Sequence, residues 1–119
     1  MAASARRVLV IEDEMLPAML LESLVSGLGY AVVGPAGRAE QAMALVDDER
    51  PDAAILDINL HGKSAFPLAS ALAERAIPFA FVTGYERDQL PAEWRARPLL
   101  QKPFTRAGLA QTLTTLLAA

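Results

Sequence analysis

The sequence predicts an α/β domain in which a five-stranded parallel sheet is covered by helices on both faces. Apolar runs alternate along the chain with segments of helical periodicity, and five such pairs are present. The apolar runs are continuous, which is typical of strands that are buried on both faces. With 119 residues, 53% of them hydrophobic, the chain is long enough for one domain of this kind and too short for a second.

The first pair is a strand over 8–11 and a helix over about 14–28. Leucine recurs at every fourth position along this helix and predicts its apolar stripe. The stripe consists of Leu16, Leu20, Leu24 and Leu28. Pro17 falls in the first turn, where proline is tolerated, and Gly29 supplies the stop.

The second pair is a strand over 30–33, closed by the Gly34–Pro35 turn, and a short helix from 39 to about 48. Arg50–Pro51 then breaks the chain. The third pair is a strand over 53–56 and, after a loop from Asn59 to Lys63, a helix rich in small residues that can pack close to the sheet. Its stripe consists of Ala65, Ala69, Leu72, Ala73 and Ala76.

The fourth strand is expected over 79–82. The segment after it, 83–98, contains two prolines and shows weak periodicity, so we expect its helix to be short or mobile. A fifth strand over 99–101 precedes a closing helix, for which Thr105 is the expected N-cap. The apolar positions of this helix are Leu109, Leu113, Leu116 and Leu117.

Composition excludes several classes of protein. The formal net charge is −3 and the 11 lysines and arginines are scattered, so the basic cluster typical of direct nucleic-acid binding is missing. The apolar stretches are far shorter than the roughly 20 residues of a membrane span, and the start of the chain lacks the apolar region of a signal peptide. The absence of cysteine excludes disulfides, thiolate metal sites and a Cys nucleophile. We therefore expect a cytoplasmic protein that binds neither membrane nor nucleic acid.

Polar side chains stand where four of the predicted strands end. They are Glu12, Asp13, Asp57, Thr83 and Lys102. Ligands of doubly wound sheets bind beyond the carboxyl ends of the strands, so we expect these side chains to converge. Clustered carboxylates repel one another unless a cation neutralises them, and Mg²⁺ prefers oxygen ligands. The set predicts a site for Mg²⁺ and a phosphoryl group.

Each of these residues has an ordinary interpretation when it is taken alone. Asp13 suits a helix N-terminus, Thr83 suits a turn before Gly84, and a single lysine is usually solvated. The ordered set favours chemistry instead. Asp57 ends a buried strand and offers a carboxylate nucleophile for phosphorus, while Thr83 and Lys102 offer a hydroxyl and a point charge to phosphoryl oxygens.

This arrangement resembles the CheY-like receiver domain of two-component response regulators over essentially the whole chain. The motif comprises an acidic pair after the first strand, Asp57 after the third, Thr83 after the fourth and Lys102-Pro103-Phe104 after the fifth. The resemblance implies a flavodoxin-like (βα)5 fold with strand order 2-1-3-4-5. It also implies that residues 1–119 form a single receiver domain without an effector domain.

The resemblance also implies a role for each site residue. Asp57 would be the phosphoacceptor, and Mg²⁺ would be held by Asp13, Asp57 and the main-chain carbonyl of Asn59, with Glu12 acting through metal-bound water. Thr83 and Lys102 would bind the phosphoryl group, and the Lys102–Pro103 peptide bond would be cis.

The implied function is that of a single-domain response regulator in a phosphorelay rather than an enzyme with a separate substrate. A histidine kinase or histidine phosphotransfer protein would supply the phosphoryl group, and the domain would catalyse its own phosphorylation and dephosphorylation. A monomer or weak dimer would then signal to a downstream protein by contact.

One departure from the family concerns the switch. Receivers usually carry an aromatic residue three positions before the lysine, where this chain has Leu99. Together with the segment 77–85, this resembles atypical, often single-domain receivers of alphaproteobacteria that are named for a Phe-Ala-Thr-Gly-Tyr motif. In this chain Val82 stands where that motif has alanine. We expect an altered switch at Thr83-Gly84-Tyr85 and hypothesise that phosphorylation orders the segment 85–94. The alternative is that Gly84 merely turns the chain and Tyr85 packs on the loop.

Other functions are less well matched. A phosphatase with an aspartate nucleophile needs a second acid two residues later, where Asn59 stands. A pseudo-receiver adaptor would bind partners without phosphate, although every expected catalytic position is filled. A cofactor binder of the same topology would need a glycine-rich loop after the first strand, and none follows it.

Four further residues are considered for special roles. His61 lies in the loop after Asp57, where a solvated side chain is expected rather than a phosphohistidine. Phe66, Trp94 and Phe104 could mark a partner surface, but aromatic residues in a domain of this size more often belong to the core.

Overall fold

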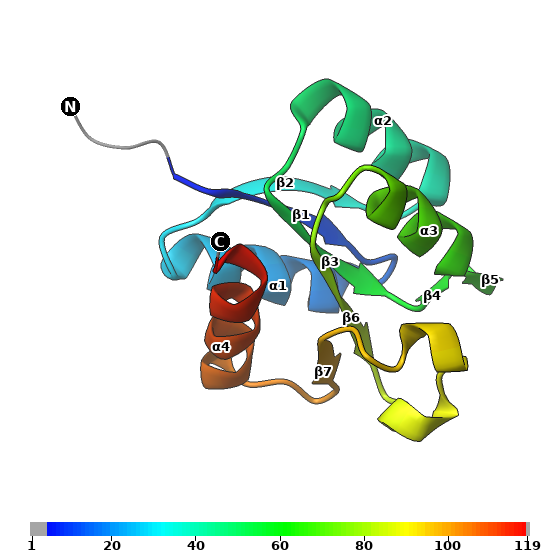
Figure 1. Ribbon diagram of the computed structural model, residues 1–119. Coiled ribbons are helices and arrows are strands. Elements are labelled where there is room, and N and C mark those ends of the chain that lie inside the picture. The colour runs from blue at the N-terminus through cyan, green and yellow to red at the C-terminus, as the bar shows by residue number, and fades with distance from the viewer. Residues whose placement is uncertain (1–4, 119) are drawn as a thin grey trace.

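The computed structural model describes residues 5–118 and shows three layers, with a parallel sheet between two pairs of helices (Figure 1). The strands of the sheet are β1 (Arg7–Ile11), β2 (Ala31–Ala36), β3 (Ala53–Asp57), β6 (Phe79–Thr83) and β7 (Leu99–Gln101). The helices are α1 (Met15–Gly27), α2 (Ala39–Glu49), α3 (Phe66–Glu74) and α4 (Arg106–Leu117). No helix within the described range is long and apolar enough to cross a membrane.

The strand order β2-β1-β3-β6-β7 confirms the predicted order 2-1-3-4-5. β3 lies at the centre, and β2 and β7 are the edges. β3 and β6 are buried at every position, as their uninterrupted apolar runs predict. The N-cap of α4 is also confirmed, since the Thr105 side chain accepts a hydrogen bond of 3.0 Å from the amide of Gly108.

Alternate side chains of each strand enter two separate cores. One core lies between the sheet and α1 with α4, and it contains Val8, Val10, Ile55, Ala80 and Val82 from the strands. The other lies under α2 and α3, and it contains Leu9, Ile11, Leu56, Phe79 and Phe81. This period of two fixes which face each strand residue occupies, and so it also fixes where the residues at the strand ends point.

The sequence predicted that the Gly34–Pro35 turn closes β2. This prediction is wrong, because the strand continues to Ala36. The register to β1 shifts between Leu9 and Ile11, and the amide of Glu12 then donates to the Ala36 carbonyl. β2 is an edge strand, where proline is tolerated and an irregularity can be absorbed. Gly34 has φ +91°, and a Cβ there would lie 2.9 Å from the amide nitrogen of Ala36, so this position requires glycine.

The predicted stripe of α1 is wrong in its first half. Leu16 and Leu20 are 76% and 49% exposed, whereas Ala18, Leu21 and Val25 form the buried face. α1 therefore has two apolar sides, one packed on the sheet and one exposed. At the N-terminal end of the helix, the leucine repeat lies on the exposed side. In α3 the predicted stripe holds at Ala69 and Leu72, but the helix ends before Ala76, which is exposed and has φ 56°.

The loop predicted between Asn59 and Lys63 contains a small antiparallel hairpin. It is formed by β4 (Asn59–Leu60) and β5 (Lys63–Ser64), and it projects beside α3 (Figure 1). His61 and Gly62 both have positive φ, of 50° and 77°, and form its tight turn.

The stretch between β6 and β7 was expected to hold a short or mobile helix, but it contains no α-helix in the described residues 84–98. It forms two single 3-10 turns, η1 (Arg87–Gln89) and η2 (Ala92–Trp94). Trp94 packs in the α2/α3 core, and Phe66 packs against the same core, so both are core residues rather than parts of an exposed partner surface. Phe104 is half-buried against the α1/α4 core.

Candidate phosphoryl and metal site

The polar residues predicted to converge do so at the carboxyl edge of the sheet. Glu12 and Asp13 follow β1, Asp57 and Thr83 are the last residues of β3 and β6, and Lys102 follows β7. The ladder aligns these ends, because Ile11 pairs with Leu56, Asp57 with Val82, and Thr83 with Gln101. Residues up to 90 positions apart therefore share one site.

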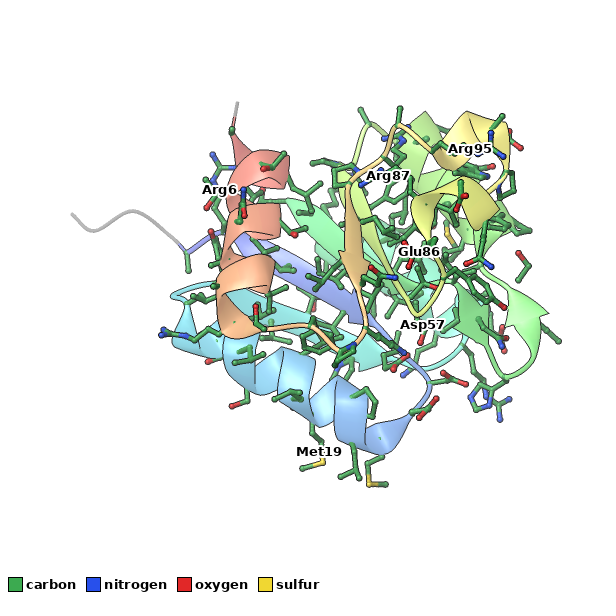
Figure 2. The ribbon with its side chains drawn as sticks, turned by 90° about the horizontal axis from the view of Figure 1, so that it is seen from below. Arg6, Met19, Asp57, Glu86, Arg87 and Arg95 are labelled. Carbon is green, nitrogen blue, oxygen red and sulfur yellow. The ribbon has the colours of Figure 1, made fainter. Side chains whose placement is uncertain are left out.

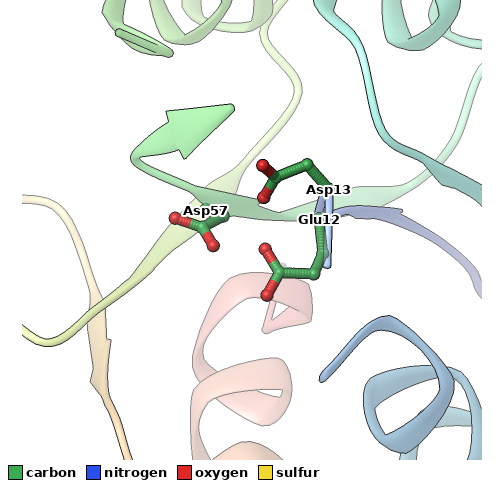
Figure 3. Close-up of side chains that lie close together, drawn as sticks. All are labelled: Glu12, Asp13 and Asp57. Atoms are coloured by element: carbon green, nitrogen blue, oxygen red, sulfur yellow. The ribbon is translucent and has the colours of Figure 1, made fainter. Parts of the chain in front are cut away.

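Three carboxylates face one another at this edge (Figure 3). Each of Glu12, Asp13 and Asp57 offers an oxygen within 4.8 Å of the others. Glu12 and Asp57 are buried, and Asp13 is partly exposed. Two main-chain amides hold the aspartates in place: Asn59 donates to Asp57 Oδ1 at 3.0 Å, and His61 donates to Asp13 Oδ2 at 2.9 Å.

Lys102 is the cation of the site. Its Nζ donates to Asp57 Oδ2 at 2.9 Å and to Glu12 Oε1 at 3.3 Å. The amide of Lys102 donates to the Thr83 carbonyl at 2.8 Å, so the lysine backbone is tied to the end of β6. The Lys102–Pro103 peptide bond is cis.

The three ionisable groups perturb one another strongly. Burial raises the pKa of Glu12 from 4.5 to about 8, and hydrogen bonding with Asp57 and the charge of that carboxylate act in the same direction. Burial would also raise the pKa of Asp57, but hydrogen bonds from Glu12, the Asn59 amide and Lys102 outweigh it and lower that pKa. Contact with Asp57 raises the pKa of Lys102 against the effect of burial. In the metal-free site the proton therefore resides on Glu12, while Asp57 is ionised.

A pocket of about 220 Å³ opens above these groups. It is lined by Asp13, Glu14, Asp57, Ile58, Asn59, Thr83, Gly84, Tyr85 and Lys102. Thr83 is buried and its Oγ1 accepts a hydrogen bond of 3.1 Å from the Tyr85 amide. Tyr85 itself is 51% exposed, and the predicted switch position Leu99 is half-buried under the α2/α3 core, away from the pocket lining.

Residues 8–114 match the response regulator receiver domain family. The chain belongs to this family. Its receiver fold agrees with that of SdrG from Sphingomonas melonis, with a TM-score of 0.84 and 44% identity over 98% of this chain and 99% of SdrG. SdrG has also been solved in a BeF3-activated conformation, which matches equally well.

Longer relatives match over the same receiver region. The transcriptional regulatory protein PdtaR of Mycobacterium tuberculosis is 34% identical over 91% of this chain and 55% of PdtaR. The regulator PhyR of Methylorubrum extorquens is 36% identical over 95% of this chain and 44% of PhyR. The chain thus spans about half the length of the curated relatives it matches, and what they share with it is a receiver domain of two-component signalling.

Receiver domains typically bind Mg²⁺, and the residues of this site fit that ion. Glu12 Oε2 is buried and lacks a hydrogen-bond partner among residues 5–118. A buried polar atom left in this way costs about 1–3 kcal/mol, which a cation or one of its waters would remove. The donor set consists of hard carboxylate oxygens, which suit Mg²⁺ and not a soft metal, and Asn59 lines the same pocket.

Three residues of the site have roles that their side-chain chemistry does not reveal. His61 contributes its main-chain amide to Asp13, whereas its imidazole lies on the exposed hairpin turn. Glu14 and Ile58 line the pocket through position alone. The His-Gly pair is a turn signal, and it could have indicated the hairpin that carries the amide.

Proposed function

We propose that this chain accepts a phosphoryl group on Asp57 from the phosphohistidine of a histidine kinase or histidine phosphotransfer protein. The observation that carries this proposal is the position of the Asp57 carboxylate. This carboxylate accepts hydrogen bonds from Lys102 and from the Asn59 amide, lies within the acidic trio, and lines a small pocket. A nucleophile, a cation and a metal-binding set are then present within one pocket.

The proposed transfer replaces one bond by another at phosphorus. An Asp57 carboxylate oxygen attacks the phosphorus atom, the bond between phosphorus and the imidazole nitrogen of the donor breaks, and its electron pair stays on that nitrogen. Lys102 Nζ and the Thr83 hydroxyl bind the phosphoryl oxygens, which carry negative charge throughout. Asp13, Asp57, the main-chain carbonyl of Asn59 and, through water, Glu12 are the residues that would hold Mg²⁺. When bound, this ion offsets the negative charge of the nucleophile and of the phosphoryl group.

Loss of the phosphoryl group completes the cycle. Water attacks the phosphorus atom of the aspartyl phosphate, the bond to the Asp57 oxygen breaks, and inorganic phosphate leaves with the carboxylate restored. The same residues serve the transfer step and the hydrolysis step, so the domain supplies the catalytic groups for its own phosphorylation and dephosphorylation and acts on no separate substrate.

The surface of α1 is where we place the protein donor. Met15, Leu16, Met19 and Leu20 are 49–76% exposed, and Met19 points away from the sheet in Figure 2. A groove of about 490 Å³ between α1 and the Pro103–Phe104 turn is lined by Leu16, Leu20 and Lys102, and Lys102 also lines the phosphoryl pocket. A helix that presents a phosphohistidine to Asp57 can therefore bury this apolar surface at the same time. After phosphorylation, the domain signals through contact with a second protein.

Acetyl phosphate with Mg²⁺ tests the chemical part of this proposal without a protein donor. Intact-protein mass spectrometry should show that wild-type protein gains one phosphate, that Asp57→Ala gains none, and that EDTA prevents the gain. Steady hydrolysis of small phosphomonoesters at many turnovers would instead indicate a phosphatase. Absence of any phosphate on wild-type protein would contradict the proposal.

A further inference from the structure

We propose that the β4–β5 hairpin (59–64) is a positioning element for the metal site and that it acts through the main-chain amide of His61. This inference rests on the proposed role of Asp13 in binding Mg²⁺, and it adds which part of the chain sets the affinity for that ion. His61 touches neither the ion nor the phosphoryl group in this role. It acts on the carboxylate of Asp13 alone.

The outer edge of β4 provides the contact. Along a strand the main-chain amides alternate between its two sides, so the amides of Asn59 and His61, two residues apart, are directed to the same side. Both donate to carboxylates of the site: Asn59 to Asp57 Oδ1 at 3.0 Å, and His61 to Asp13 Oδ2 at 2.9 Å. An edge that would otherwise present free donors to solvent is thus used to hold two of the three acidic side chains.

The direction of the His61 amide depends on the tight turn that follows it. His61 and Gly62 have φ of 50° and 77°, in the region that glycine adopts freely and branched residues avoid. A Cβ on Gly62 would meet no atom within 4 Å. A side chain at position 62 would therefore disturb the turn through its backbone preference and not through a clash, and it would displace the amide of His61 together with the turn.

The base of the hairpin is anchored independently of any ion. Leu60 is buried in the α2/α3 core, and the amide of Ala65 donates to the Ile58 carbonyl at 2.8 Å, which closes the hairpin at its base. Ser64 Oγ accepts a hydrogen bond of 3.2 Å from the amide of Phe66, the first residue of α3. Figure 1 shows the hairpin beside this helix. The His61 amide is therefore in place before a cation binds.

Asp13 is the carboxylate that benefits most from such a contact. It is the least buried of the three acids, so its side chain is the freest to turn into solvent. The hydrogen bond from His61 uses one carboxylate oxygen and leaves the other for a cation, and bonds of this charge-assisted kind are stronger than neutral ones. Loss of a partner that orients a metal ligand typically weakens metal affinity by about 10–100-fold.

Substitution of Gly62 tests whether the turn sets the affinity. The dissociation constant for Mg²⁺ is measured from amide chemical shifts during titration with MgCl2, and we expect Gly62→Val to raise it about tenfold. Gly62→Asn should recover most of the lost affinity, because asparagine tolerates positive φ. An unchanged dissociation constant in Gly62→Val would overturn the inference.

Gly29→Val is the matched control for backbone strain. Gly29 has φ 96° and also leaves open space for a Cβ, but it lies between α1 and β2, at the opposite end of the sheet from the metal site. We expect thermal unfolding to show a comparable loss of stability in Gly29→Val and Gly62→Val, whereas Gly29→Val should keep the wild-type dissociation constant. An equal loss of Mg²⁺ affinity in Gly29→Val would show that general destabilisation is the cause, and would overturn the inference.

Hydrogen exchange in EDTA tests the contact without any metal ion. In wild-type protein the His61 amide should exchange more slowly than the Gly62 amide on the same turn, each relative to its rate in an unstructured peptide. This protection should be lost in Asp13→Ala, which removes the acceptor, and reduced in Gly62→Val. Fast exchange of the His61 amide in wild-type protein, or protection that persists in Asp13→Ala, would overturn the inference and leave the proposed function standing. A wild-type protein that binds no Mg²⁺ would overturn both.

Discussion

Glu12 and Asp57 divide one proton between two buried carboxyl groups in the absence of a metal ion. The pKa of Glu12 is raised to about 8 by burial and by Asp57, while the pKa of Asp57 is lowered through its hydrogen bonds with Glu12, Asn59 and Lys102. Asp57 therefore stays ionised at neutral pH, as the proposed phosphoacceptor requires, and Glu12 carries the proton until a cation displaces it.

The proton on Glu12 makes the stability of the metal-free protein depend on pH. Between the unfolded pKa of 4.5 and the folded pKa of about 8, the unfolded chain loses the proton and the folded chain retains it, so stability falls as pH rises. The lowered pKa of Asp57 has the opposite effect, since it makes stability rise with pH. This effect is confined to pH values near or below the ordinary pKa of 3.8. Urea unfolding in EDTA should therefore show a lower free energy of unfolding at pH 8 than at pH 5, by more than about 1 kcal/mol. Mg²⁺ should reduce this difference in the free energy of unfolding between pH 5 and pH 8, because a cation favours ionised Glu12. A protein that is as stable at pH 8 as at pH 5 in EDTA would contradict this proton assignment.

Glu12→Gln removes the charge while keeping the shape of the side chain. In EDTA at pH 8, we expect the free energy of unfolding to increase by about 1 kcal/mol, because repulsion between buried carboxylates is lost. Mg²⁺ should then stabilise the variant less than it stabilises wild-type protein. Glu40→Gln, on the exposed first turn of α2, is the matched control and should change the free energy by less than about 0.5 kcal/mol. A destabilised Glu12→Gln in EDTA would show that the site needs the charge even without a cation.

At the scale of elements, α1 has two apolar sides with different roles. The side formed by Ala18, Leu21 and Val25 packs on the sheet, and the side formed by Met15, Leu16, Met19 and Leu20 remains exposed beside Lys102. Exposed apolar side chains gathered on one helix indicate an interaction surface rather than a packing element.

A charge on the outer side of α1 should separate donor binding from chemistry. We expect Leu16→Glu to slow phosphotransfer from the cognate kinase or phosphotransfer protein by about tenfold or more, because a carboxylate disrupts an apolar contact. Gln111→Glu adds the same charge at an exposed site on α4 and should leave the transfer rate close to that of wild type. The rates are measured by following loss of label from the phosphorylated donor. Equal rates for Leu16→Glu and wild type would place the donor elsewhere.

Glycine substitutions test the irregular edge strand that positions Glu12. Gly34→Ala should destabilise the protein by about 1–3 kcal/mol, because alanine strains the positive φ and its Cβ would meet the Ala36 amide. Gly27→Ala, in the last turn of α1, places its Cβ in open space and should stabilise by about 0.5 kcal/mol. Thermal unfolding measures both changes. A neutral Gly34→Ala would show that β2 can adopt another path.

The elements differ in how far sequence could predict them. The buried strands were predictable because a run such as Ala53–Leu56 leaves no polar position to face water, and Thr105 was predictable because its hydroxyl has a defined acceptor role. The exposed side of α1 was not predictable from the sequence. Leu16 and Leu21 are chemically alike, and only tertiary packing determines which of them is buried. The hairpin after Asp57 was too short for a periodic signal.

At the scale of the whole molecule, the site is an outcome of topology. Strand order brings the ends of β1, β3, β6 and β7 together, and this placement was predictable once the strands were assigned. What sequence could not supply is the detail set by burial: which carboxyl group holds the proton, which main-chain amide holds Asp13, and which aromatic residue enters the core beside β6. The two cores on opposite faces of the sheet separate the exposed surface of α1 from Trp94.

Chemical trapping of the phosphoryl group tests the proposed phosphorylation of Asp57 most directly. Wild-type protein is treated with acetyl phosphate and Mg²⁺, and borohydride then reduces any aspartyl phosphate to homoserine, which peptide mass spectrometry can place. We expect homoserine at position 57 alone, and none when EDTA replaces Mg²⁺. Trapping at Asp13, an acid-labile phosphate on His61, or no modification at all would contradict this expectation.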